Sequence, residues 1–195
     1  LHKAIRRQRQ MCIRDRFKTT GNDNIFLATR NGMAICFNEN DARAVGRTAS
    51  GVKAIDLADG DYVVGAEPVR EDSKVLLVTD GGYGKCTDLT SFRIQHRGGK
   101  GLKAYKITEK TGNIIGISMV NDSEELIMVT SEGVVIRIRI KDIATTTGRI
   151  TQGVRLINLN DGVIVVSMDK ISAEDTVEEE SEENNTEVTA ETTEE

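Results

Sequence analysis

The feature that most constrains this chain is an internal repeat of about 50 residues. Three similar apolar runs end in a threonine, at spacings of 50 and 51 residues: Thr29, Thr79 and Thr130. Each threonine is followed by two further residues and then a glycine: Gly32, Gly82 and Gly133. A fixed period of this size is typical of propellers, solenoids and other repeat arrays.

Each repeat contains four strand-like runs separated by glycine turns. The first two flank the glycine just described, and a third begins at Gly51, Gly101 or Gly153. The fourth follows a turn such as Asp59-Gly60 and covers 62–66, 114–120 or 163–168. No segment keeps the apolar stripe of a helix over three turns. We therefore predict an all-β, propeller-like fold of four-stranded antiparallel blades.

The repeats predict three blades within residues 21–171, at about 24–73, 74–124 and 125–171. Several of their apolar runs are continuous, which is expected where blades stack and bury both faces of each sheet. Propellers close with about four to eight blades, so three blades predict a partial ring that belongs to a larger one.

The two ends of the chain differ from the nearly neutral body in charge. Residues 1–16 hold six Lys/Arg and one Asp, and we predict that 1–20 is a basic leader, disordered or foreign to the domain. A basic nucleic-acid arm is the alternative. Residues 171–195 hold eleven Asp/Glu and no Lys or Arg. The segment 172–195 is therefore predicted to be a disordered acidic tail, either a solubilising end or a competitor for a cationic face.

Cations recur at two positions when the repeats are aligned on Gly51, Gly101 and Gly153. Four residues before each glycine stand Arg47, Arg97 and Arg149, and two residues after it stand Lys53, Lys103 and Arg155. Core packing does not require a cation at either position, although repeats of common origin also retain solvated charges by inheritance. A track of cations repeated from blade to blade suits a polyanion, and backbone phosphates can hold a bent duplex without base contacts. Aromatic residues make up only 4% of the chain, so a platform for stacking single-stranded bases is not predicted.

The second repeat elaborates this pattern in Gln95-His96-Arg97-Gly98-Gly99-Lys100-Gly101. Its glycines allow positive φ and a close approach of the backbone to a ligand. Consecutive N–H groups in such a turn can surround an anion, and Arg97 and Lys100 would add charge-assisted hydrogen bonds. An exposed turn with two solvated cations is the alternative interpretation.

The sequence carries no recognisable catalytic, metal or membrane motif. It contains no GxxxxGK[ST] loop, no GxSxG and no HExxH. Three cysteines without CxxC spacing and two histidines predict no zinc site and a reduced thiol set. No run approaches the roughly 18 apolar residues of a membrane span, and no secretory signal is present. We therefore expect a cytoplasmic chain with no cofactor of its own.

The motif Gln95–Gly101 resembles the gyrase-A box (QRRGGKG), with His96 in place of the first arginine. The flanking segments 46–53 (GRTASGVK), 83–85 (YGK) and 148–156 (GRITQGVRL) agree with this. Residues 20–170 are thus similar to the last three of six blades in the C-terminal domain of the DNA gyrase A-subunit family. The motif lies in the penultimate blade, whereas the principal box of that family normally lies in the first.

This resemblance implies a β-pinwheel that wraps duplex DNA around a basic rim and so supports negative supercoiling. It implies a parent type II topoisomerase that uses ATP and Mg²⁺, with the catalytic tyrosine and the ATPase outside this chain. The implied partners are double-stranded DNA and, in the parent complex, the gyrase B subunit together with the rest of the A subunit. The alternatives are the matching domain in the A subunit of topoisomerase IV and a propeller-like protein-interaction scaffold. The expected DNA-binding residues are Arg47, Lys53, Gln95, His96, Arg97, Gly98, Gly99, Lys100, Gly101, Lys103, Arg149 and Arg155.

Overall fold

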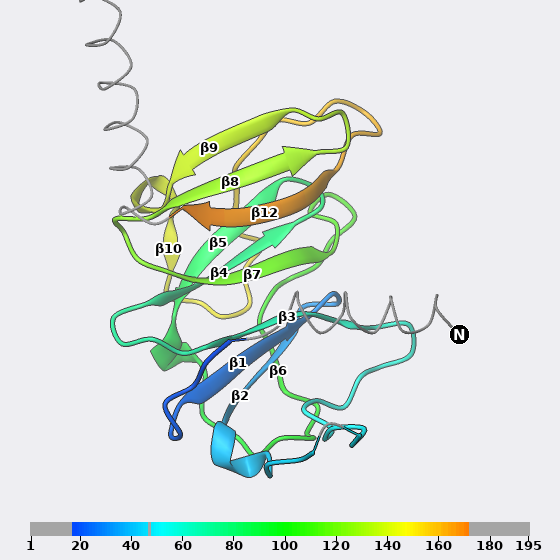
Figure 1. The fold of residues 1–195 in the computed structure, drawn as a ribbon. Helices are drawn as coiled ribbons and strands as arrows, with labels where there is room; N and C mark the ends of the chain where they lie inside the picture. Colours follow the sequence, from blue (N-terminus) through cyan, green and yellow to red (C-terminus); the bar gives the residue numbers. More distant parts are fainter. Residues whose placement is uncertain (1–16, 47, 172–195) are drawn as a thin grey trace, which may run out of the picture.

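A computed structural model describes residues 17–46 and 48–171 as three β-sheets stacked face to face (Figure 1). Each repeat contributes three antiparallel strands to its own sheet. The strands of the three repeats are β1 (Asn24–Thr29), β2 (Met33–Asn38) and β3 (Val63–Pro68); β4 (Lys74–Thr79), β5 (Tyr83–Asp88) and β7 (Ile114–Val120); and β8 (Glu125–Thr130), β9 (Val135–Arg139) and β12 (Val165–Ile171). The predicted all-β fold is confirmed. The predictions for residues 1–16, Arg47 and the acidic tail fall outside the described residues.

The recurrent threonine and glycine together form the hairpin turn of every repeat. The glycines Gly32, Gly82 and Gly133 have φ of 84°, 76° and 80°, values that favour glycine. In the second repeat the Gly82 N–H donates to the Thr79 carbonyl (3.0 Å), and the Tyr83 N–H donates to the Thr79 hydroxyl (3.2 Å). The same bonds occur in the other two repeats. The 50-residue spacing of these residues is therefore the spacing of one hairpin turn.

Short 3₁₀ turns follow the second strand of each repeat and were not predicted. They are η1 (Glu39–Asp41), η2 (Leu89–Ser91) and η3 (Ile140–Asp142). Each is closed by the next N–H, which donates to the first carbonyl of the turn at 2.9–3.0 Å. These turns direct the chain from the edge strand into the long loop that carries the predicted cations.

The third strand of each repeat differs from the prediction in length and in place. In the second and third repeats it has only two residues, β6 (Leu102–Lys103) and β11 (Val154–Arg155). β6 pairs with β2, and β11 pairs with β5, so each lies on the sheet of the preceding repeat. A further two-residue strand, β10 (Thr145–Thr146), pairs with β5 in parallel. The three sheets consequently differ in strand number, with β12-β8-β9 alone in the third.

The glycine that leads the third strand explains why the strand lies on the neighbouring sheet. Gly101 has φ of 72°, and a Cβ at this position would lie 2.5 Å from the Ala34 carbonyl oxygen. A side chain would therefore clash with the backbone of β2. Only glycine lets the segment approach closely enough to pair.

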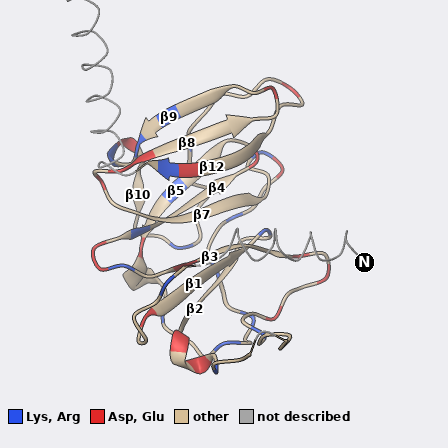
Figure 2. Cartoon of the chain, viewed as in Figure 1, with Lys and Arg blue, Asp and Glu red and all other residues tan. Residues whose placement is uncertain are grey.

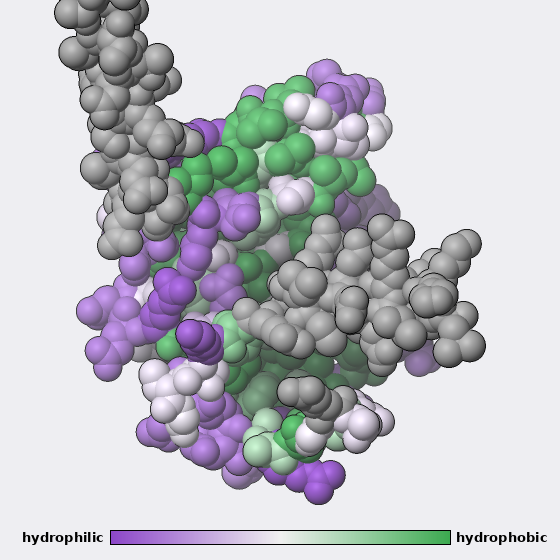
Figure 3. Space-filling model, viewed as in Figure 1, coloured by the Kyte–Doolittle hydropathy of each residue, from purple (hydrophilic) through white to green (hydrophobic). Residues whose placement is uncertain are grey.

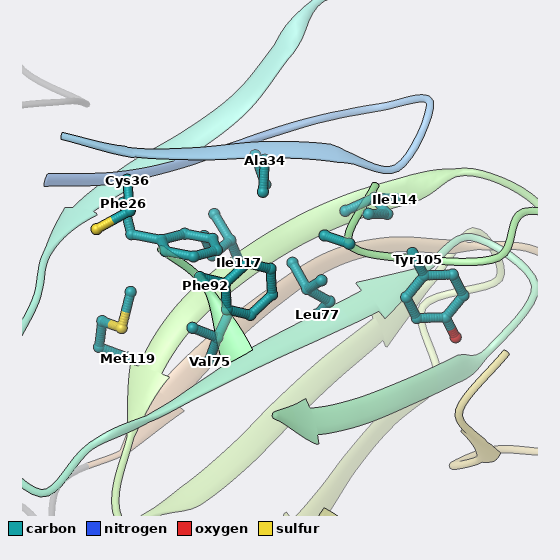
Figure 4. Packing of buried hydrophobic residues seen from close by; sticks show 12 residues of the cluster. Phe26, Ala34, Cys36, Val75, Leu77, Phe92, Tyr105, Ile114, Ile117 and Met119 are labelled. Carbon is teal, nitrogen blue, oxygen red and sulfur yellow. The ribbon is translucent and has the colours of Figure 1, made fainter. Parts of the chain in front are cut away.

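The core lies between the sheets and is mainly aliphatic, with a few large aromatic side chains among them. Figure 4 shows Phe26 and Ala34 of the first sheet facing Val75 and Leu77 of the second. Phe92, from the loop after η2, packs edge to face on Phe26 with ring centroids 4.8 Å apart. A second cluster fills the space between the second and third sheets. Because β4 is covered on both faces, its apolar run is continuous rather than alternating.

We expect Phe26→Ala to lower the free energy of unfolding by about 3–5 kcal/mol, because it leaves a cavity between two sheets. Phe26 is fully buried, whereas Phe17 is 42% exposed and serves as the control. Chemical denaturation of Phe26→Ala and Phe17→Ala measures the difference. Equal losses in the two variants would contradict this account of the core.

Candidate nucleic-acid interface

The predicted cations that the structure describes lie at one edge of the stack, which we call the outer rim. At the opposite, inner edge β7 lies against both β3 and β12. The outer rim is formed by β2, β5 and β9, the segments that pair with them, and the loop residues 42–46, 48–61, 92–113 and 143–163. Figure 2 shows that Lys, Arg, Asp and Glu lie mainly in connecting loops rather than in the strands. Blade-to-blade pairing thus places the loops of successive repeats next to one another.

The glycine-rich loop of the second repeat is tied to the segment that follows Gly51. The Gly98 N–H donates to the Ala54 carbonyl (2.6 Å), and the Asp56 N–H donates to the Gly99 carbonyl (2.8 Å). Gly98 takes the positive φ (81°) expected of this turn. Its N–H is occupied, however, so the expected ring of free N–H groups around an anion is not complete. The loop presents its cations from a backbone fixed by the first repeat.

Arg97 and Arg149 each bridge two carbonyls of the preceding repeat. The Arg97 guanidinium donates to Asp41 O (Nε, 2.7 Å) and Lys53 O (Nη1, 3.0 Å). Arg149 donates to Lys103 O (Nε, 2.9 Å) and, through Nη1, to Ser91 O (3.3 Å). Both side chains are half-buried. The first recurrent cation therefore acts as a clamp between repeats, a role that sequence comparison did not reveal.

The second recurrent cation is exposed in all three repeats. Lys53 pairs with Asp56, and this lysine holds the pKa of the Asp56 carboxyl below its usual value. Arg155 donates to the Tyr83 hydroxyl from Nε (3.2 Å) and Nη2 (3.0 Å), and this contact lowers the pKa of the phenol. Lys103 and Lys100 are exposed, and neither forms a salt bridge within residues 17–46 and 48–171.

Gln95 and His96, the first two residues of the box-like motif, have opposite environments. The His96 side chain is 97% exposed, with Nδ1 3.3 Å from a carboxylate oxygen of Asp41. The Gln95 amide nitrogen is buried and has no hydrogen-bond partner among the described residues. The Gln95 N–H donates to the Cys36 carbonyl (2.8 Å), which anchors the loop to β2. Gly101, the last residue of the motif, immediately precedes β6, and Arg47 lies outside the described residues.

Lys85, which the sequence analysis named only within the flanking segment 83–85, is a buried structural cation. It is fully buried, and its Nζ donates to the carbonyls of Arg149 (2.5 Å) and Gly148 (3.4 Å). Nζ also lies 5.4 Å from the centroid of the Tyr105 ring. Burial, aided by the Arg149 charge, lowers the pKa of Lys85 to about 8. Its sequence signal is a lysine where the other repeats carry Ile35 and Ile136.

The cysteines and acidic side chains of the described residues do not gather into a metal centre. In that part of the chain no group of three or more His, Cys, Asp or Glu is placed to hold a metal ion. Cys36 and Cys86 are free and buried, and burial raises the pKa of the Cys86 thiol to about 11. None of the described segments forms a helix long and apolar enough to cross a membrane.

Stacked antiparallel sheets, in which β6 and β11 each pair with the sheet of the preceding repeat, together with exposed cations on the outer rim, define a propeller-type repeat domain. The sequence matches the family described as DNA gyrase C-terminal domain, beta-propeller, over residues 23–70, 73–121 and 124–172. The chain therefore belongs to this family.

Relatives and solved structures agree with this assignment. The DNA gyrase A subunit of Staphylococcus epidermidis is 46% identical over 159 residues, which are 80% of this chain and 18% of that protein. The corresponding subunit of Ureaplasma parvum is 47% identical over 142 residues, 73% of this chain and 17% of the relative. The C-terminal domain of a DNA topoisomerase IV superposes with a TM-score of 0.77 at 27% identity, over 87% of this chain and 53% of that one. A DNA gyrase A C-terminal domain gives 0.72 at 25% identity, over 77% and 51%. The chain thus spans less than a fifth of its curated relatives and about half of the solved domains.

We expect Lys85 to make stability depend on pH. Its pKa is about 8 in the folded chain against 10.5 when unperturbed, so the unfolded state binds more protons between these values. The free energy of unfolding should therefore rise as pH increases from 8 to 10.5, by up to about 3 kcal/mol from this group. Denaturation of the wild type and Lys85→Ile across this range measures the difference in slope. Identical slopes would show that Lys85 is not the buried cation described above.

Proposed function

We propose that this chain binds double-stranded DNA along its outer rim and bends it. The observation that carries the proposal is the exposed cation at one position of all three repeats: Lys53, Lys103 and Arg155. Lys100 adds a fourth exposed cation in the loop of the second repeat. Such cations contact phosphates without reading sequence. The track suits a duplex that follows the rim from blade to blade.

The clamps support this function indirectly. Arg97 and Arg149 hold the loops of adjacent repeats by their carbonyls, so the cations on those loops keep a fixed spacing. Smooth bending of 20–30 bp costs on the order of 1–6 kcal/mol, and prepositioned phosphate contacts must offset it. Each guanidinium retains further donors, because arginine has five N–H groups. Gln95, His96 and Gly98–Gly101 contribute by shaping and anchoring the loop between these contacts.

In the longer protein we infer a DNA-wrapping module of a gyrase A-type subunit, located in the cytoplasm. Family membership and the similarity to gyrase A subunits support this inference. The gyrase B subunit, the remaining part of the A chain, ATP and Mg²⁺ belong to the proposed parent enzyme. A topoisomerase IV subunit is the second candidate, because the superposition on such a domain has a higher TM-score (0.77) than that on a gyrase domain (0.72). The motif Gln95–Gly101 favours gyrase.

Duplex binding should weaken steeply with salt. If the four exposed cations each neutralise one phosphate, the logarithm of the binding constant should fall with the logarithm of salt concentration at a slope of about −3.6. Titration of a mixed-sequence duplex at several salt concentrations measures the slope. Binding that is insensitive to both salt and competitor duplex would instead support a protein-interaction scaffold.

Removal of a single exposed cation should weaken binding to all DNA sequences equally. We expect Lys100→Ala to weaken binding to every duplex alike and to reduce the slope by about 1. Lys18→Ala is the control, because Lys18 is exposed and lines the groove formed with β3, β7 and β12 at the inner edge. Loss confined to one DNA sequence, or an equal loss in the control, would contradict phosphate binding at the rim.

The clamp at Arg97 can be separated from a plain phosphate contact by Arg97→Lys. Lysine keeps the charge but cannot reproduce the planar bridge to Asp41 O and Lys53 O. We therefore expect Arg97→Lys to lose nearly as much duplex affinity as Arg97→Ala and to unfold at lower denaturant than the wild type. Recovery of wild-type affinity and stability in Arg97→Lys would show that only the charge matters.

A further inference from the structure

The stack is narrowest at its inner edge, where the last strands of the three repeats meet. β3 and β12 both lie against β7, whereas β2 and β9 make no comparable approach to β5 among the described residues (Figure 1). Figure 3 shows apolar surface over the part of the molecule that holds the third sheet, to which β12 belongs. Adjacent sheets are therefore closer together at the inner edge than at the outer rim.

Two glycines permit this close approach. Gly65 of β3 and Gly116 of β7 hold the same place in their repeats, because each pairs with the residue just before the hairpin threonine. A Cβ at Gly65 would lie 2.8 Å from Ile117 Cγ2, and one at Gly116 would lie 2.4 Å from Met168 Cγ. Neither glycine is among those with positive φ. The space between the sheets, rather than the backbone conformation, thus requires glycine at both places.

A row of polar contacts crosses the same edge and links all three repeats. The Glu67 carboxylate of β3 accepts hydrogen bonds from the Ser118 hydroxyl (3.1 Å) and the Met119 N–H (2.9 Å) of β7. From the other side, Lys170 of β12 donates from Nζ to the Met119 carbonyl (2.7 Å), and this Nζ lies 3.8 Å from a Glu67 carboxylate oxygen. The Met119 backbone is therefore held between a carboxylate of the first repeat and an ammonium of the third.

Different contacts fix the spacing of the repeats at the outer rim. There β6 pairs with β2 and β11 pairs with β5, while Arg97 and Arg149 bridge carbonyls of the preceding repeat. None of these contacts involves β3, β7 or β12. The two edges are thus held at separate spacings, and the difference between them defines an angle between neighbouring sheets. A close-packed interior resists compression and maintains such an angle.

We propose that Gly65, Gly116 and the contacts between Glu67 and Lys170 set the curvature that the outer rim imposes on a bound duplex. The inference rests on the proposed function, because it concerns the path of DNA along that rim. These are positioning residues, since they lie at the edge opposite the exposed cations. A duplex on the wide side of a wedge bends around the narrow side, at a cost in free energy. Spreading the inner edge should therefore straighten the rim without removing a cation.

The variant Gly116→Ala tests this inference in the 195-residue chain, because its Cβ meets Met168 and spreads the inner edge. A mixed-sequence duplex with a fluorophore at each end is saturated with protein, and energy transfer between the ends measures the bend. We expect lower transfer than in the wild type, with the same dependence of binding on salt, since no cation is lost. Val166→Ala is the control, because Val166 lies on β12 but is 52% exposed, and it should bend the duplex as the wild type does.

The double variant Gly116→Ala/Met168→Ala distinguishes a widened edge from a damaged fold. Shortening Met168 makes room for the added Cβ, so energy transfer should return towards the wild-type value. Gly65→Ala is a milder second variant, because within 4 Å its Cβ meets only Ile117 Cγ2, and it should lower the transfer in the same direction.

Two results would overturn the inference and leave DNA bending in place: equal transfer in the wild type and both alanine variants, or no recovery in the double variant. A wild type that neither binds nor bends the duplex would instead remove the proposed function, and this inference with it.

Discussion

The pairing of a short glycine-led segment with the edge strand of the preceding sheet is the contact on which this structure depends. It joins repeats whose sheets could not bury their faces alone. It also caps an edge that would otherwise present unpaired backbone groups. At Gly101 and Gly153 a Cβ would collide with the backbone of the preceding repeat, so only glycine fits where the two repeats pair. Because this pairing fixes each repeat against the next, it also positions the stacked sheets and the mainly aliphatic core between them.

The same pairing between repeats determines where the recurrent cations lie. Because β6 and β11 each pair with the sheet of the preceding repeat at the outer rim, Lys103 and Arg155 lie on the sheets of the first and second repeats rather than on their own. Arg97 and Arg149 reinforce the crossing by bridging carbonyls, and the buried Lys85 holds the loop of Arg149 from below. Cations that bridge backbone carbonyls and cations that are exposed therefore alternate along one rim. A surface built in this way keeps its charges at regular intervals, which suits a long polyanion better than a compact ligand.

Most of the regular strands could be predicted from the sequence because their signals are local. The threonine and glycine of each hairpin form bonds within five residues, and the continuous apolar runs indicate sheets covered on both sides. The candidate site was predicted less completely. Lys100 and Lys103 are exposed as expected, but Arg97 and Arg149 are engaged with backbone carbonyls and the Gly98 N–H is occupied. Each of these partners lies some 44 to 58 residues away in the sequence, beyond the reach of any local pattern.

The sequence by itself determined the period, the turn chemistry, the strand class and the recurrence of cations, because each depends on residues close together in the chain. Only the tertiary structure decided which sheet receives the third strand and which of the two recurrent cations is exposed. Both depend on the approach of one repeat to another, where the absence of a side chain at one glycine permits pairing. The lysine at position 85, where the other repeats have isoleucine, is explained only by the folded loop of Arg149, whose carbonyl accepts a hydrogen bond from Lys85.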